Sequence, residues 1–112
     1  MHVEQSYFDQ INEEIKTVEA RPYYPTYHGS AEGDSILLIS PSGEELLVGI
    51  EKKTWYRDFE SMLRAETVPA CLPGLMHDEL TTALSIYHSF RDNSYKKLAL
   101  KYGVIAFKIK HM

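Results

Sequence analysis

Hydrophobic side chains recur at helical spacing in four stretches of the chain. In the first, Phe8, Ile11 and Ile15 form one face of a helix that Ser6 is expected to cap. The other three have the same i, i+3, i+4 spacing, and they are residues 58–66, a segment that begins near residue 76 and includes Tyr87, and residues 95–102. Residues typical of helix ends flank these stretches, namely Asp58, the cluster Asp92–Ser94 and Gly103.

Other stretches alternate in polarity or are continuously apolar, and both patterns predict β-strands. A short strand is expected within residues 1–5, and longer ones at residues 17–21, 35–40, 44–53 and 104–110. Pro41-Ser42-Gly43 predicts a hairpin turn, and the apolar run 36–39 before it predicts a strand buried on both faces. Strands separated by helices in this order predict an α+β fold, a small mixed β-barrel with flanking helices, in one domain spanning residues 1–112.

The first of the longer predicted strands carries a row of polar side chains along one face. Thr17, Glu19 and Arg21 alternate with Val18 and Ala20, so the polar and apolar groups fall on opposite faces. Glu19 and Arg21 are about 7 Å apart along such a strand, which lets their long side chains meet. Unpaired polar groups are costly to bury. This row is therefore a solvated face, a structural ion pair or the lining of a binding site.

Composition indicates one ordinary globular domain and limits how it meets nucleic acid. The chain has 112 residues, of which 44% are hydrophobic and 25% charged, and its formal net charge is −4. This charge argues against binding nucleic acid with the whole surface but leaves room for a local basic groove. No low-complexity tract or internal repeat suggests a second unit.

Several features bear on the cellular compartment. No apolar run approaches the roughly 20 residues that span a bilayer. The polar, acidic start Met1–Gln5 does not resemble a signal peptide. Cys71 is the single cysteine, so no internal disulfide can form. We expect a cytoplasmic or nuclear protein without a membrane partner.

Several different short motifs follow one another along the chain in a definite order. The segment Lys16–Arg21 reads K-x-x-E-x-R, Gly33-Asp34 precedes a predicted strand, and Tyr56–Glu60 opens a predicted helix. The other matching segments are residues 45–48, 72–74, 86–90 and 101–106. This ordered set resembles the ASCH domain, a branch of the PUA-like superfamily, over nearly the whole chain. The resemblance implies a small mixed β-barrel of that type with flanking helices.

The resemblance also implies a site. Lys16, Glu19 and Arg21 of the motif would line a cleft between barrel and helices, where the family is proposed to bind RNA or single-stranded nucleic acid. The family signature has a glycine two residues before the lysine, and this sequence has Glu14 there. A glycine at that place often permits a positive φ. We therefore expect the first helix to run on slightly and to bring an extra carboxylate near the site.

The first functional hypothesis is a module that binds single-stranded RNA or a modified nucleotide. Lys16 and Arg21 would contact phosphate or a base edge, and Glu19 would accept a hydrogen bond from an exocyclic amine. Further candidates are aromatic or basic side chains that could stack on unpaired bases or meet the backbone, namely Tyr23, Tyr24, Trp55, Tyr56 and Lys53. The alternative for these aromatics is packing within the fold.

The second hypothesis is a hydrolase acting on RNA or an acylated nucleoside, as in an amidohydrolase branch that the resemblance includes. Lys16 with a lowered pKa would act as base, Glu19 would shuttle a proton, and Glu66 would be the downstream glutamate. That branch has a threonine three residues after the lysine, where this chain has Glu19, which counts against the same activity. A third hypothesis is a protein-interaction module, for which the sequence names no partner.

Cofactor and metal chemistry find little support in the sequence. There is no P-loop and no G-x-G-x-x-G. His77 and His88 would lie about 16 Å apart on one helix, too far to share a metal. Cys71 lies between apolar neighbours, which predicts a buried, unreactive thiol. We therefore expect neither a cofactor nor a metal ion.

Overall fold

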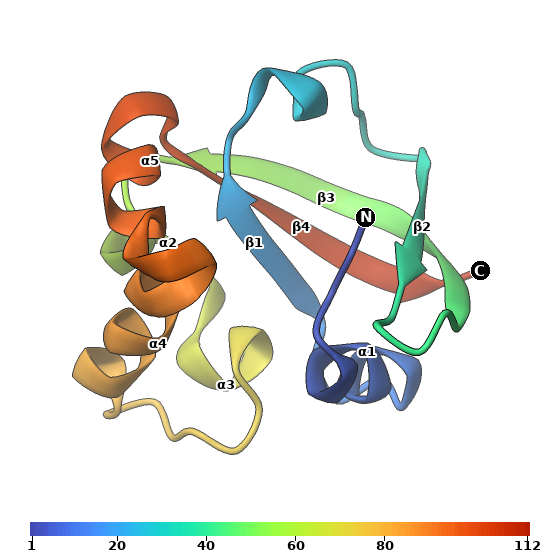
Figure 1. The fold of residues 1–112 in the computed structure, drawn as a ribbon, viewed down its shortest axis with the longest axis horizontal. Coiled ribbons are helices and arrows are strands. Elements are labelled where there is room, and N and C mark those ends of the chain that lie inside the picture. The colour runs from blue at the N-terminus through green and yellow to red at the C-terminus, as the bar shows by residue number, and fades with distance from the viewer.

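A curled antiparallel sheet of four strands crosses the molecule, as the computed structural model of residues 1–112 shows (Figure 1). The strands lie in the order β1-β4-β3-β2. Their bounds are β1 Val18–Pro22, β2 Ser35–Ile39, β3 Glu45–Tyr56 and β4 Val104–His111. The sheet bends into half a barrel, and β1 and β2 form its two edges. The predicted α+β class is confirmed.

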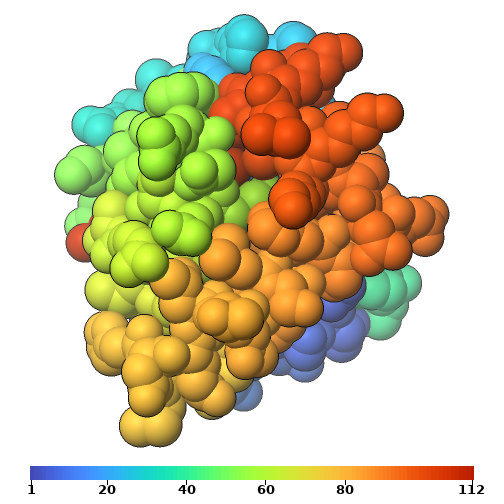
Figure 2. Space-filling model, turned by 90° about the vertical axis from the view of Figure 1, so that its left-hand side faces the viewer, coloured from blue at the N-terminus to red at the C-terminus, as the bar shows by residue number.

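Helices cover both sides of this half-barrel. α1 lies under the concave side, whereas α2 to α5 gather on the other side, where α2, α4 and α5 form one continuous surface (Figures 1 and 2). The bounds are α1 Gln5–Asn12, a 3-10 turn η1 Pro25–Tyr27, α2 Phe59–Glu66, α3 Val68–Cys71, α4 Leu80–Asn93 and α5 Tyr95–Tyr102. The sequence pattern did not predict α3, a single turn with Pro69 near its start, where proline is tolerated.

The N-terminal segment closes most of the gap between the two edge strands. His2 forms a parallel bridge with Ile39 of β2, and Val3 N–H donates to the Ile39 carbonyl at 3.1 Å. On the other side of the segment, the Arg21 guanidinium of β1 donates through Nη2 to the His2 carbonyl. The barrel is therefore completed by one bridge and one side chain. This bridge is its sole parallel pairing, and the strand expected within residues 1–5 is reduced to it.

Two hydrophobic cores lie on opposite faces of the sheet. β4 shows the division, because Phe107 and Ile109 point into the barrel, where they pack with Phe8 and Ile11 of α1. Its alternate residues, such as Ala106, point into the core under α2 to α5. All five residues of β1 are buried, because this short strand is covered on both faces.

β2 departs from the pattern expected of it. Leu37 is 41% exposed and its cross-strand neighbour Leu47 is 47% exposed, whereas Leu38 is fully buried. The predicted burial on both faces was wrong, because no helix covers the outer face of this edge strand. A continuously apolar run does not by itself distinguish one covered face from two.

The helix ends agree with the sequence at Asp58 and at Gly103, which ends α5 with φ 75°, and depart from it in two cases. Asp58 caps α2, and its carboxylate accepts from Ser61 N–H at 2.8 Å. α1 begins at Gln5 after Glu4, so Ser6 is not its cap. The cluster Asp92–Ser94 places no side chain on the amides of α5.

The first helix ends where the family signature has its glycine. α1 stops at Asn12, and Glu14 adopts φ 61°, in the left-handed region that glycine favours. The expected extension of the helix was wrong, because the backbone must reverse here to enter β1. Glu14 is exposed.

Replacing Glu14 by glycine should stabilise the fold. Glu14→Gly removes the cost of a side chain in the left-handed region, and we expect the free energy of unfolding to rise by about 0.5–1 kcal/mol. Urea unfolding followed by circular dichroism measures this. The matched control is Glu13→Gly, at φ −85°, which gains nothing and should lower stability. Equal changes in the two variants would contradict the account.

Candidate functional site

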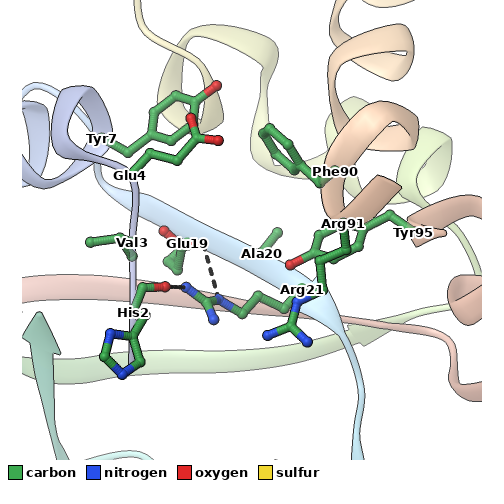
Figure 3. A pocket seen from close by; sticks show the side chains of 10 residues that line it. All are labelled: His2, Val3, Glu4, Tyr7, Glu19, Ala20, Arg21, Phe90, Arg91 and Tyr95. Atoms are coloured by element: carbon green, nitrogen blue, oxygen red, sulfur yellow. Dashed lines mark hydrogen bonds and ion pairs between the residues drawn. The ribbon is translucent and has the colours of Figure 1, made fainter. Parts of the chain in front are cut away.

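A cavity of about 160 Å³ lies along the free edge of β1 (Figure 3). Three parts of the chain form its walls: the N-terminal segment with Tyr7, the β1 residues Glu19 to Arg21, and the junction between α4 and α5. Polar and apolar groups alternate on these walls. The cavity therefore combines aromatic surface with charged side chains from distant parts of the sequence.

An ion pair forms the β1 wall of this cavity. Glu19 and Arg21 are each only 8% exposed, and Arg21 Nε lies 3.5 Å from Glu19 Oε1. Arg21 also donates through Nη2 to the His2 carbonyl and through Nη1 to the Tyr27 hydroxyl at 3.5 Å. Burial lowers the pKa of Arg21, but Glu19 and Tyr27 outweigh this, so the net direction is upward. The guanidinium is thus committed to the protein.

The Glu19 carboxylate is less committed. The carboxylate oxygens accept no hydrogen bond from the protein besides this ion pair. Neither oxygen is among the fully buried side-chain atoms that lack a partner. A carboxylate has about four acceptor positions. Arg21, itself bonded to the His2 carbonyl and the Tyr27 hydroxyl, positions this carboxylate in the wall. Glu19 therefore offers a fixed acceptor to any donor that enters.

Lys16 has a different place from the other two motif residues. It is 3% exposed, and its Nζ donates to the Val18 carbonyl at 2.8 Å and to the Cys71 carbonyl. The ammonium also lies 5.2 Å from the centre of the Tyr7 ring. Lys16 does not line the cavity. It ties the start of β1 to the end of α3, so the structure brings together two of the three expected groups.

Burial has a direct effect on the Lys16 charge. Desolvation lowers the pKa of its ammonium, and the attraction of Glu19 opposes that shift. Two carbonyl oxygens and an aromatic face surround the group, and all of these favour a cation. Lys16 is therefore a buried donor that orders the backbone beneath the cavity.

Comparison with known proteins bears on this architecture. The sequence model of the ASCH domain matches residues 1–111. The chain belongs to the ASCH domain family. Comparison with curated proteins gave no match.

Two solved structures share the fold of this ASCH domain. The crystal structure of hypothetical protein PH0355 has 27% sequence identity and a TM-score of 0.84, with 100% of this chain and 96% of that chain covered. The solution NMR structure of protein PF0455 from Pyrococcus furiosus has 25% identity and a TM-score of 0.69, with coverage of 98% and 96%. The fold is therefore shared over full length with proteins that have no stated activity.

The loop after β1 in this ASCH domain holds its own aromatic side chains. Tyr23 packs against His28 with ring centroids 4.4 Å apart and ring planes tilted by 44°, and the ring centroids of Tyr24 and Tyr102 are 5.6 Å apart. Lys53 Nζ reaches into the same loop and donates to the Tyr27 and Ser30 carbonyls at 3.0 and 2.7 Å. None of the predicted site residues Tyr23, Tyr24 and Lys53 lines the cavity.

The aromatic end of β3 lies away from the cavity as well. Trp55 is 55% exposed, and its Nε1 donates to the Tyr102 carbonyl at 3.1 Å. The indole covers Gly103, where an added Cβ would lie only 2.2 Å from Trp55 Nε1. Tyr56 donates its hydroxyl to Glu66, and burial raises the pKa of Tyr56 to about 12. Trp55, Tyr56 and Glu66 therefore form local contacts around the end of the sheet.

Sequence reasoning assigned none of the lining residues outside β1 to the site, namely His2, Val3, Glu4, Tyr7, Phe90, Arg91 and Tyr95. Tyr7 and Phe90 meet edge to face with centroids 6.0 Å apart, and Phe90 meets Tyr95 in the same way at 5.5 Å. Arg91 completes the group. Their positions depend on the junction after α4 returning toward α1, which no local pattern reveals. Phe90 fell inside a recognised family segment, and that was the only available signal.

Metal binding, membrane insertion and thiol chemistry find less support in the structure. No group of three or more histidine, cysteine, aspartate or glutamate side chains is placed to hold a metal ion. None of the helices has the length and apolar character needed to cross a membrane. The Cys71 thiol is fully buried beside Met62, with Sγ and Sδ 3.5 Å apart.

We expect Lys16→Met to lower stability markedly. The variant leaves the Val18 and Cys71 carbonyls without their buried donor, at a cost of about 2–4 kcal/mol in the free energy of unfolding. Urea unfolding is the measurement. Lys53→Met also removes a donor from two carbonyls, but at a half-exposed position where water replaces it, so its loss should stay below about 1 kcal/mol. A smaller effect at Lys16 than at Lys53 would refute its structural role.

Cys71 should be inert in the native state. Burial raises the pKa of the Cys71 thiol from 9.0 to about 12, so at pH 8 only about one molecule in ten thousand carries the reactive thiolate. Because folding favours the protonated thiol, this contribution to stability is complete below pH 9 and is lost as the pH rises toward 12. A chromogenic disulfide reagent should label the unfolded chain in urea and leave the native chain unlabelled. Rapid native labelling would contradict this.

Proposed function

We propose that this ASCH domain binds single-stranded RNA or a modified nucleotide by taking one base into the cavity at β1. The observation that carries the proposal is the Glu19 carboxylate, held by Arg21 in the cavity wall without a protein hydrogen-bond donor. An exocyclic amine of a base supplies such a donor. Tyr7 and Phe90 supply apolar ring surface on the opposite wall.

The size of the cavity supports a single unpaired base. About 160 Å³ is small beside pockets for drug-sized ligands, which span roughly 300–1,000 Å³. Proteins that read RNA sequence mostly do so on unpaired bases, which they stack on aromatic rings and bond along their edges. A net charge of −4 further disfavours broad contact with a duplex backbone.

The hydrolase alternative draws less support. Lys16, its proposed base, donates to two backbone carbonyls and does not reach the cavity. Glu66, its second carboxylate, is bonded to Tyr56 and is not part of the cavity wall. Glu19 alone of the three candidates is placed to meet a ligand. Binding without turnover is therefore the function that the geometry favours.

A titration of labelled single-stranded RNA tests the proposal. Fluorescence anisotropy at several salt concentrations should show binding that weakens with salt and is poorer for a duplex of the same sequence. Glu19→Gln should weaken binding by about 1–3 kcal/mol, because an amide places a donor where the base needs an acceptor. Glu60→Gln is the control, since it alters an exposed carboxylate of α2 that is paired with Arg64.

Two results would overturn the proposal. One is the absence of binding at low salt, where phosphate contacts are strongest. The other is equal affinity of the Glu19→Gln and Glu60→Gln proteins. Incubation with N-acetylated cytidine serves as the parallel assay for the hydrolase. Turnover that is lost in Glu19→Gln would favour that alternative instead.

A further inference from the structure

The last residues of α4, where it joins α5, depart from right-handed helical geometry. Arg91, Asp92 and Asn93 have φ values of 50°, 55° and 66°, so three successive residues other than glycine lie in the left-handed region. The Ser94 amide closes the turn on the Phe90 carbonyl at 3.2 Å and on the Arg91 carbonyl at 3.1 Å. The chain thus makes one turn of left-handed helix between two right-handed helices.

This turn is costly. Each such residue costs roughly 1–2 kcal/mol, and consecutive left-handed residues are rare outside glycine. Backbone strain of this kind clusters at functional sites, where the surrounding structure holds it. Phe90, directly before the turn, and Tyr95, two residues after it, are both in the cavity wall. The strain therefore lies at the cavity rather than in a remote loop.

The turn places Arg91 at the cavity, next to Arg21 (Figure 3). Figure 3 shows both guanidinium groups on one side, with Glu4 and Tyr7 on the opposite side. The Arg91 guanidinium carbon lies 5.8 Å from the centre of the Tyr24 ring. The Tyr24 hydroxyl is buried and has no hydrogen-bond partner.

The two arginines differ in what they can offer. Arg21 is neutralised by Glu19 and bonded to two further groups, whereas Arg91 forms no ion pair and is exposed. Arg21 and Arg91 lie close enough together to affect the same two tyrosines. Burial raises the pKa of Tyr24 and of Tyr95, and the positive charge of each arginine opposes that rise. Arg91 is therefore the guanidinium of the wall that remains free to pair with an anion.

We propose that Arg91 is the phosphate-binding residue of the cavity, so that the ligand is a nucleotide and not a free nucleoside. This inference rests on the proposed function and names the class of ligand that the cavity binds. A guanidinium presents two parallel N–H groups that match the oxygens of a phosphate. When a base lies against Glu19, its phosphate would lie on the Arg91 side of the cavity. There it would pair with Arg91, the arginine of the wall that has no anionic partner.

Matched pairs of small ligands test this assignment. Nucleosides and their 5′- and 3′-monophosphates, from all four bases, are titrated into the protein and followed by NMR chemical shifts. The native protein should bind at least one monophosphate about tenfold more tightly than its nucleoside. Arg91→Ala should remove this difference, Arg57→Ala should keep it, and Glu19→Gln should weaken both ligands.

Two further variants separate charge from folding. Arg91→Gly suits the left-handed backbone, so it should keep or raise stability while it loses the preference for phosphate. Arg57→Ala is the control, because Arg57 is an exposed arginine outside the cavity. With single-stranded RNA, loss of the Arg91 contact should reduce the slope of log affinity against log salt by about 0.7, and Arg57→Ala should not.

The outcomes distinguish the two proposals. Nucleosides that bind as tightly as their monophosphates, or an Arg91→Ala protein with undiminished preference for phosphate, would overturn the role of Arg91 and leave the base-binding site intact. Failure of the native protein to bind any nucleoside, nucleotide or single-stranded RNA would overturn both.

Discussion

The Arg21 guanidinium is the interaction on which the rest of the structure depends. It reaches from β1 to the His2 carbonyl of the N-terminal segment, which in turn is bridged to β2. The same group pairs with Glu19 and fixes its carboxylate in the cavity wall. Closing the barrel and shaping the cavity are thus two results of one buried cation.

Charge burial of this kind is seldom favourable for stability alone. A buried ion pair costs desolvation energy that its own attraction only partly returns, and an apolar replacement is often as stable. Here two residues of the motif are stabilised in different ways. Lys16 is satisfied by backbone carbonyls and serves the architecture, whereas Glu19 keeps acceptor capacity that faces a cavity. The K-x-x-E-x-R motif therefore combines one structural cation with one ion pair at a cavity.

How far the sequence predicts this molecule depends on whether a feature is local. Helical and strand periodicity located the amphipathic helices and the hairpin, and Asp58 was recognised as a cap, because these features are set by residues close in sequence. The end of α1 was misjudged, because Glu14 adopts a glycine-like backbone that its own preference opposes. The outer face of β2 was misjudged, because coverage depends on distant helices.

The candidate site shows the same division. Alternation along β1 correctly placed Glu19 and Arg21 together, since period two is a property of the strand itself. Lys16 was expected beside them, but its long side chain turns to the end of α3, a choice set by tertiary packing. Arg91 was missed because it reaches the cavity only through a left-handed turn, which Asp92 and Asn93 tolerate but which no periodic pattern indicates.

The closure of the barrel by a side chain has a consequence for access. Between the N-terminal segment and β1 there is no ladder of amides, so this seam can part without disrupting the sheet. Local openings of this kind cost far less than global unfolding. On the β1 side, the position of the first residues of the chain therefore depends on one side-chain contact and not on a strand pairing.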